Sequence, residues 1–249
     1  MFNTIYIMWL RQIKRYWRSK SRIIGSIGQP LLFLIALGFG LGPVFERAGQ
    51  GNYLNFLAPG VMGQTILFMA IFNGVELIWD RQFGFLKETL VAPISRLEIV
   101  LGRVLGGATI ATFQGVLVFC LTLPLGFRPE ISLLSVSAPG LMFLIALVYT
   151  ALGTAIASLM KDFHGFQLIM NFLVMPTYFL SGAIFPLESA PPVLKSISRV
   201  NPLTYGIDGL RQVLTGTSRL GLATDILVLI AISFILLLVS SYLFSKIEA

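Results

Sequence analysis

Apolar stretches of membrane-spanning length follow one another along most of the chain, separated by short polar segments. Six of them come close to the ~20 residues with which an α-helix crosses ~30 Å of hydrocarbon. They lie at about Ile23–Leu41, Phe56–Ile78, Ile99–Leu125, Gly140–Met160, Phe166–Phe185 and Ile226–Phe244. Pro30 and Pro176 fall inside the first and fifth stretches and predict kinks, because neighbouring helices can satisfy the backbone groups that a proline leaves free. The pattern predicts an all-α integral membrane protein with six transmembrane helices in a single domain, residues 1–249.

The segment before the first stretch, residues 1–22, has the spacing of an amphipathic helix. Aromatic and aliphatic side chains from Phe2 to Trp17 share one face, and the opposite face carries Arg11, Lys14, Arg15 and Arg18. A basic face opposite tryptophan and phenylalanine is typical of a helix that lies in the headgroup plane of a membrane. The alternative is a soluble amphipathic helix that packs on a partner.

The polar connection between the second and third stretches, residues 79–98, mixes charged and large apolar side chains. Pro93 interrupts it, which predicts a short helix before the proline and a turn after it. The apolar residues are too few to span a membrane and too many for a passive loop, which favours a docking surface. A solvated loop is the alternative.

The connection before the last stretch, residues 186–224, contains four prolines and has apolar positions between them. Leu203, Ile207, Leu210 and Leu214 recur at helical spacing and predict a short amphipathic helix. Neither half of the connection is long enough to cross a bilayer. We expect it to dip into the outer leaflet or to cap the helices there.

Composition agrees with a membrane protein. The chain is 56% hydrophobic and has a mean hydropathy of +0.85. Its charged residues make up 12% of the sequence, which is about half the fraction in a soluble domain. The net charge of +7 does not indicate nucleic-acid binding, because the basic residues lie at the ends of apolar stretches. With the amino terminus inside, twelve of the 18 lysines and arginines fall on the cytoplasmic side. This bias predicts a multi-pass protein of the inner (plasma) membrane with both termini in the cytoplasm.

Residues that could carry covalent chemistry are scarce. No G-x-x-x-x-G-K-[ST] sequence is present, so nucleotide phosphates are not held by a loop of that kind in this chain. The single histidine, His164, lacks nearby partners for a metal or a catalytic site, so neither a catalytic nor a metal-binding residue is expected. The single cysteine, Cys120, lies within an apolar stretch and cannot form an intramolecular disulfide.

Polar residues inside the spans are the candidates for a transport path. Gln64, Asn73, Gln114 and Asn171 could line a path for a polar or amphiphilic substrate or could hold helices together. Glu76 could be a gate residue or an interfacial carboxylate near Arg81 or Arg103. Two glycine pairs, Gly38 with Gly42 and Gly102 with Gly106, have the G-x-x-x-G spacing that permits close helix approach.

Two stretches of sequence resemble the ABC-2 type permeases, and most closely the drug-resistance and nodulation-factor branch of these exporters. The first, residues 85–96, reads FLKETLVAPISR and is similar to the family's K-E-x-L-x-x-P-x-S segment. The second runs from FLSG at residues 179–182 through FPL at 185–187 to NPLTY at 201–205 and then Arg211. It is similar to the family's F-L-S-G, F-P and N-P-L-T-Y signature. The order of the predicted elements matches the family over nearly the whole chain.

The resemblance implies partners and site residues. Two six-helix permeases, often identical, would pair with two copies of a separate ATP-binding cassette ATPase, which would hold the ATP and Mg and hydrolyse the ATP; no cofactor is expected on this chain. The ATPase-coupling residues would be Phe83, Phe85, Leu86, Lys87, Glu88 and Leu90, with the phenylalanines and Leu86 as a hydrophobic anchor and the charges at the rim. Short outer helices would help to close the exit side, with Pro186, Asn201, Pro202, Tyr205 and Arg211 as structural or gate residues.

These observations favour the membrane subunit of an ATP-driven exporter for an amphiphilic small molecule, drug-like or lipid-like, over two other classes. The transport mechanism would be alternation between two states, without covalent chemistry by this chain. A lipid-linked polysaccharide or another glycolipid is the alternative substrate. A membrane-embedded lipid-modifying enzyme and a passive channel are the remote alternatives.

Overall fold

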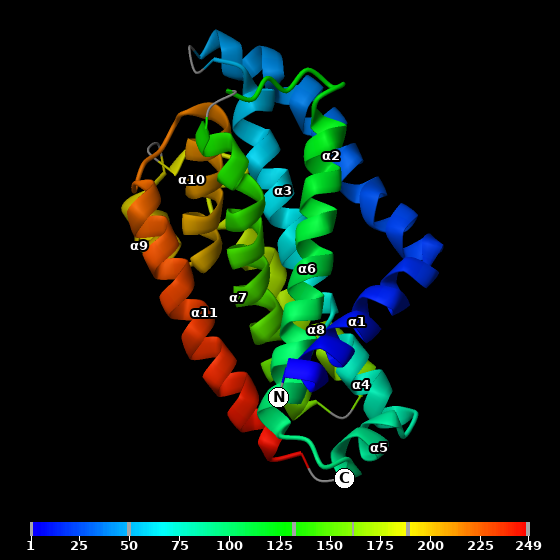
Figure 1. Ribbon diagram of the computed structural model, residues 1–249. Coiled ribbons are helices and arrows are strands. Elements are labelled where there is room, and N and C mark those ends of the chain that lie inside the picture. The colour runs from blue at the N-terminus through cyan, green and yellow to red at the C-terminus, as the bar shows by residue number, and fades with distance from the viewer. Residues whose placement is uncertain (1, 49–50, 131–132, 161, 188–189, 248–249) are drawn as a thin grey trace.

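The computed structural model describes residues 2–48, 51–130, 133–160, 162–187 and 190–247, and its regular elements are helices (Figure 1). The first half comprises α1 (Phe2–Arg18), α2 (Lys20–Arg47), α3 (Tyr53–Phe72), α4 (Val75–Gln82), α5 (Phe85–Val91) and α6 (Arg96–Thr122). The second half comprises the short 3₁₀-helix η1 (Leu133–Ser137), α7 (Ala138–Leu159), α8 (Phe163–Phe179), α9 (Pro192–Val200), α10 (Pro202–Thr215) and α11 (Leu222–Ser245). The predicted all-α class is confirmed.

Five segments are long and apolar enough to cross a membrane, among the residues that the structure describes. They are Lys20–Arg47, Tyr53–Gln82, Arg96–Thr122, Leu134–Leu159 and Leu222–Ser245. They correspond to the predicted first, second, third, fourth and sixth stretches, with ends shifted by a few residues. The protein is therefore a helical bundle of membrane-spanning character.

The fifth predicted stretch is a shorter helix than expected. Its helix, α8, has 17 residues and ends at Phe179, although the hydropathy pattern continued to Phe185. The backbone turns at Gly182, where φ is +79°, a conformation that favours glycine. Arg211, from α10, donates to the Gly182 carbonyl at 2.8 Å and thereby holds the non-helical segment in place.

The second predicted stretch is interrupted between α3 and α4. The break lies at Asn73 and Gly74, where the chain passes very close to α7. A Cβ atom on Gly74 would lie 2.5 Å from the carbonyl oxygen of Gly153, and one on Gly153 would lie 2.7 Å from the carbonyl oxygen of Ile71. Two glycines thus let the backbones touch at the point where α3 gives way to α4.

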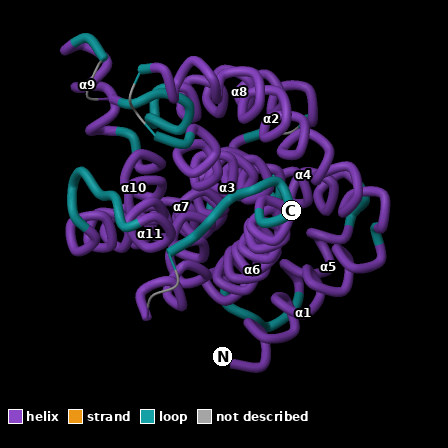
Figure 2. Tube along the Cα trace, turned by 90° about the horizontal axis from the view of Figure 1, so that it is seen from above, coloured by secondary structure: helices purple, strands orange, loops and turns teal. Residues whose placement is uncertain are grey.

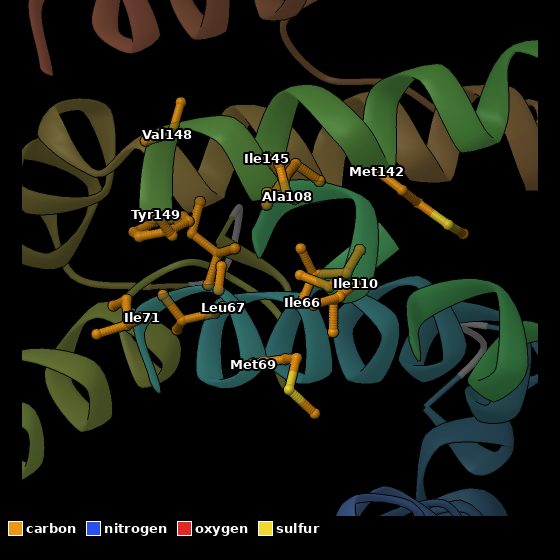
Figure 3. Packing of buried hydrophobic residues seen from close by; sticks show 14 of the residues in the cluster. Ile66, Leu67, Met69, Ile71, Ala108, Ile110, Met142, Ile145, Val148 and Tyr149 are labelled. Atoms are coloured by element: carbon orange, nitrogen blue, oxygen red, sulfur yellow. The ribbon is translucent and has the colours of Figure 1, made fainter. Parts of the chain in front are cut away.

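The hydrophobic core surrounds α3. Of the most apolar part of the span at residues 53–82, 89% is buried, against 11% for α2 and 17% for α11. Figure 3 shows Ile66 and Leu67 of α3 beside Ile110 of α6 and Ile145 of α7, while Met69 points to the other side of the helix. Seen from above, α2, α8 and α11 lie around this core (Figure 2). The exposed apolar surfaces of α2 and α11 suit contact with lipid or with another chain.

The two ends of the bundle carry different elements. The start of α1, together with α4, α5 and the end of α11, lies at one end, which we call the α5 end (Figure 1). Arg96, at the start of α6, donates to the carbonyl oxygen of Ile247 at 2.8 Å and so ties the last turn of the chain to this end. The end of α2, the start of α3, the end of α6 and η1 lie at the opposite end, with α10 near them, and we call it the α10 end.

Helix α1 packs along α6 through one of the two glycine pairs. A Cβ atom on Gly102 would lie 2.5 Å from the Cβ atom of Met8, and one on Gly106 would lie 2.7 Å from the Cβ atom of Gln12. In the other pair, a Cβ on Gly38 would lie 3.1 Å from the Leu54 side chain, whereas a Cβ on Gly42 would meet nothing within 4 Å. Both glycines of the Gly102 pair therefore permit close approach, whereas Gly42 does not contribute to it.

This packing yields a prediction for Gly106→Leu. The larger side chain must push α1 away from α6, because the facing atoms are already in contact. We expect the free energy of unfolding in detergent to fall by about 1–3 kcal/mol and trypsin to cleave α1 faster. Gly42→Leu is the matched control and should leave both measurements unchanged. Equal losses in the two variants would contradict the packing of α1 on α6.

Candidate functional site

A buried cluster of ion pairs joins α1, α4 and α6 at the α5 end. Its centre is Asp80, whose side chain is 4% exposed. Arg11 donates two hydrogen bonds to the Asp80 carboxylate, at 2.8 and 3.1 Å, and Arg15 donates a weaker one at 3.4 Å. Arg103, itself buried, donates to the same carboxylate from α6. A buried charge needs such compensation, so the cluster fixes the three helices relative to one another.

A second carboxylate, Glu76, lies one helical turn before Asp80 on α4. Arg22, near the start of α2, donates to Glu76 at 2.6 Å, and the Arg15 guanidinium is 3.9 Å away. One interpretation of the sequence placed Glu76 near Arg81 or Arg103. Arg103 lies close enough to interact electrostatically with Glu76, but its ion pair is with Asp80, and Arg81 donates to the carbonyl oxygen of Met160 at 2.7 Å.

The basic face of α1 is therefore divided between ion pairs within the protein and exposed charges. Arg11 and Arg15 face the carboxylates of α4, whereas Lys14 and Arg18 are exposed. The signal for this arrangement was present in the sequence, because both the arginines and the carboxylates are four residues apart and can form matching faces. Reading α1 only as a helix on a membrane surface missed it.

Two of the four candidate path residues hold helices together. Gln114 on α6 accepts a hydrogen bond from the Tyr16 hydroxyl at 2.6 Å and donates to the Ser26 hydroxyl at 2.7 Å, which joins α1, α2 and α6. Burial, opposed by the nearby Arg22 cation, raises the pKa of Tyr16, so its hydroxyl stays protonated and able to donate. Asn73 donates to the carbonyl oxygen of Gly107 at 3.1 Å.

The other two candidates lie at a surface of the protein, Asn171 on the outside and Gln64 at an internal cavity. Asn171, near the middle of α8, is exposed on the outside of the protein. Gln64 on α3 is 3% exposed and lines a cavity of about 650 Å³. This cavity lies among α2, α3, α4 and the start of α8, and Arg15, Arg22 and Glu76 also line it.

The predicted coupling segment forms a short helix at the α5 end. Phe83 is 83% exposed and Val91 is 82% exposed, and the charged side chains of Lys87 and Glu88 are exposed between them. Gly84 precedes the helix with φ of +80°, which turns α5 away from α4. The segment thus presents an apolar and charged surface.

The predicted hydrophobic anchor of this segment needs a correction. Leu86 is 2% exposed and packs into the core, and Leu90 is partly buried. Phe85 lies under Arg11, whose guanidinium carbon is 3.7 Å from the ring centre. Phe85 and Leu86 therefore attach α5 to the bundle, and Phe83 is the predicted apolar residue that remains free to contact a partner.

The motif residues of the second stretch hold the α10 end together. Asn201 accepts a hydrogen bond from the Leu203 amide at 3.0 Å, which caps α10, and donates to the carbonyl oxygen of Thr177 at 2.6 Å. Pro202 occupies the first turn of α10, a position that suits proline. Tyr205 donates to the carbonyl oxygen of Arg199 at 2.7 Å.

Arg211 links α10 to two other parts of the chain. Its guanidinium lies 3.8 Å from the ring centre of Phe56 and donates to the Gly182 carbonyl. Pro186 lines a smaller cavity of about 270 Å³ beside Arg211. Tyr205 and Arg211 thus both bind backbone carbonyl groups within the protein.

One buried carboxylate was not foreseen. Asp225, in the first turn of α11, is completely buried, and neither of its oxygens has a hydrogen-bond partner within the described parts of the chain. The sequence analysis assigned it to neither the outer connection nor the sixth apolar stretch, because it lies between the two. Its burial depends on the packing of α11 against α10, where a Cβ on Gly209 would lie 3.5 Å from the Asp225 side chain.

Comparison with known proteins agrees with this arrangement. The sequence model of the family described as ABC-2 type transporter matches residues 3–215. Nodulation protein J of Rhizobium leguminosarum bv. trifolii is 30% identical over 213 residues, which cover 85% of this chain and 78% of that protein. The ycf38 protein of Porphyra purpurea, whose name marks it as a candidate transport permease, is 32% identical over 215 residues, 83% of this chain and 72% of that protein.

The family match covers both motif stretches and all but the last of the long helices. Membership implies a transport subunit rather than an enzyme, and association with an ATP-binding cassette subunit. The apolar helices agree with a multi-pass membrane protein. The expected resemblance is confirmed: this chain belongs to the ABC-2 type transporter family of membrane transport permeases.

Proposed function

We propose that the chain is the membrane-spanning half of an exporter that moves an amphiphilic small molecule out of the cell. A separate cassette ATPase, in two copies, holds ATP and Mg and drives alternation between two states. The observation that carries this proposal is the exposed surface of α5 and the residues just before it, formed by Phe83, Lys87, Glu88 and Val91. Exposed aromatic and aliphatic side chains flanked by charges suit a docking site for another protein.

The same end of the bundle offers a route by which a movement of α5 reaches the other helices. Arg11 contacts the Phe85 ring on one side and the Asp80 carboxylate on the other. Helix α5 is therefore joined to α1 and, through Asp80, to α6. A cassette subunit that displaces α5 would displace α1 with it, because the charges of this cluster cannot separate cheaply in a buried setting.

The membrane arrangement follows from the two ends of the bundle. We place the α5 end in the cytoplasm of a cell with the chain in its inner (plasma) membrane, because the lysine and arginine bias favours that side. The start of α1 and the end of α11 lie at this end (Figure 1), which supports an even number of crossings. We therefore take the 17-residue α8 as the fifth of six crossings, and its length of about 26 Å is near the lower limit for a transmembrane helix.

A second permease, taken to be identical, would cover α8. This helix packs against α3 and α4 only at a few points, and Leu168, Phe172 and Asn171 are exposed on it. An amide side chain facing hydrocarbon is unfavourable, so the Asn171 side of α8 suits a partner helix or a polar path between two permeases.

The proposed docking surface yields a prediction about binding of the cassette ATPase. Phe83→Asp combined with Val91→Asp should abolish co-purification of a stoichiometric cassette ATPase from the host membrane, because both changes put charge on the docking surface. Phe85 is left unchanged, since Arg11 packs on it. The measurement is the ratio of ATPase to permease after affinity purification in mild detergent.

The matched control is Val136→Asp. Val136 is 79% exposed and lies in η1, at the α10 end. The Val136→Asp variant should co-purify with the ATPase at the same ratio as the native chain. If the native chain brings down no cassette ATPase, or if Val136→Asp loses it as completely as the α5 variant does, the exporter proposal fails.

A second prediction concerns the ion-pair cluster. Asp80→Asn leaves Arg103 buried without its carboxylate and should lower the free energy of unfolding in detergent by about 3–5 kcal/mol. It should also free α1, so that trypsin cleaves at the arginines of that helix sooner. Glu88→Gln, which removes an exposed carboxylate from α5, is the control and should change unfolding by less than about 0.5 kcal/mol. A stable Asp80→Asn variant with a protected α1 would show that the cluster does not hold the helices.

A third prediction concerns pairing of permeases. In a Cys120→Ser background, Asn171→Cys should give a covalent dimer in native membranes on treatment with a short bifunctional maleimide. Leu227→Cys is the control, because Leu227 is 68% exposed on α11, on another side of the bundle. Cross-linking at Leu227 but not at Asn171 would place the pairing surface on α11 and overturn the assignment of α8.

A further inference from the structure

The cavity beside α3 has a charged end and aromatic walls. Arg15, Arg22 and Glu76 line it at the α5 end, together with Ser19 and Ser21. Trp79 lies at the same end, with its ring centre 5.7 Å from the Arg15 guanidinium carbon, and Phe163 of α8 stacks on it. Phe68 and Phe72 of α3 line the wall farther from this end, where Ser26, Gln29 and Thr65 add polar groups. Its volume of about 650 Å³ lies within the range of small-molecule sites. Such a division between one charged end and aromatic walls matches the shape of an amphiphile.

The charge at the polar end has a positive surplus. Four arginines of the cluster, Arg11, Arg15, Arg22 and Arg103, face only two carboxylates, those of Glu76 and Asp80. Arg11 and Arg103 both bind Asp80, and Arg22 binds Glu76 at 2.6 Å. Arg15 is the least committed of the four, since its contacts are at 3.4 and 3.9 Å and 35% of its side chain is exposed.

We infer that the cavity binds an amphiphile that carries an acidic group, a phosphate or a carboxylate, and that this is the chemical class of the exported molecule. The acidic group lies between Arg15 and Arg22, where charge-assisted hydrogen bonds are strongest. The apolar chain lies along Phe68 and Phe72 of α3, which line the cavity away from the arginines. The identification of this ligand as cargo rests on the proposed export function.

A cationic amphiphile fits this site poorly. It would meet Arg15 and Arg22 at the polar end, and the carboxylate of Glu76 already accepts from Arg22. An uncharged amphiphile would leave the positive surplus unbalanced. Electrostatic complementarity therefore selects an acid among ligands with the same apolar chain.

The test uses the full-length chain in nanodiscs of phosphatidylcholine, with dodecyl phosphate that carries a diazirine in its alkyl chain. After irradiation, mass spectrometry should find the label on the peptides of α3 and α4 that contain Phe68, Phe72 and Trp79. Unlabelled dodecyl phosphate should compete, whereas dodecanol and dodecyltrimethylammonium should not. Equal competition by all three headgroups would overturn the acidic specificity.

Two pairs of variants test the charge and the space separately. Arg15→Gln leaves each carboxylate with at least one other arginine and should weaken competition by dodecyl phosphate about tenfold. Arg18→Gln, which removes an exposed arginine of the same helix, should have no effect.

Gly25→Leu removes no charge but fills the cavity, because Gly25 lines it and an added Cβ meets nothing within 4 Å. Gly28→Leu is its control, since Gly28 has equal space and does not line the cavity.

The remaining outcomes separate the ligand from its source. If Gly25→Leu and Gly28→Leu label alike, the ligand does not occupy the cavity and the inference fails. If phosphatidylglycerol added to the nanodiscs competes as well as dodecyl phosphate, the cavity is a lipid headgroup site and the cargo assignment is overturned. Labelling needs no ATPase, so a chain that binds dodecyl phosphate without retaining a cassette ATPase would refute the export function alone. A chain that retains the ATPase but fails to bind would refute this inference alone.

Discussion

Asp80 is a buried carboxylate on α4 whose oxygens accept hydrogen bonds from arginines of two other helices, Arg11 and Arg15 of α1 and Arg103 of α6. Removing a charge from water is tolerated in a protein only where opposite charges compensate for it. The position of α1 along α6 and the direction in which the chain leaves α4 toward α5 are therefore set together. Both candidate surfaces of the α5 end, the exposed face of α5 and the cavity beside α3, depend on this one cluster for their positions.

Packing without water between the helices imposes a second condition. Helices in hydrocarbon gain little from burying apolar surface against one another, so they associate where small residues allow close contact and where polar groups pair. Gly74 with Gly153 and Gly102 with Gly106 supply the close contacts, at the α3–α4 break and under α1 respectively. Gln114 supplies a polar link between three helices. These contacts concentrate around α3 and α6, which leaves α2, α8 and α11 with apolar faces free for lipid or a partner chain.

Hydropathy predicted the long helices well, because the apolar composition of a segment reflects its lipid environment. That environment is nearly uniform along a membrane span. It could not predict where α8 ends, because Arg211, far away in sequence, fixes the turn at Gly182. It could not predict the break after Phe72 either, which depends on Gly153 of another helix. The roles of polar residues were less predictable still. The sequence left open whether Asn73 and Gln114 line a path or hold helices together, and their hydrogen bonds to other helices show the second role.

The cavity and α5 share one network of charges, and this has a consequence for transport. Arg15 lines the cavity and also contacts Asp80, while Arg11 contacts both Asp80 and the Phe85 ring of α5. In the proposed exporter, a displacement of α5 that alters the contact of Arg11 with Asp80 would change how the remaining arginines are shared between the two carboxylates. Because such coupling is reciprocal, an acidic ligand between Arg15 and Arg22 would in turn favour one position of α5. Ligand binding and ATPase engagement would then be linked through the same few guanidinium groups.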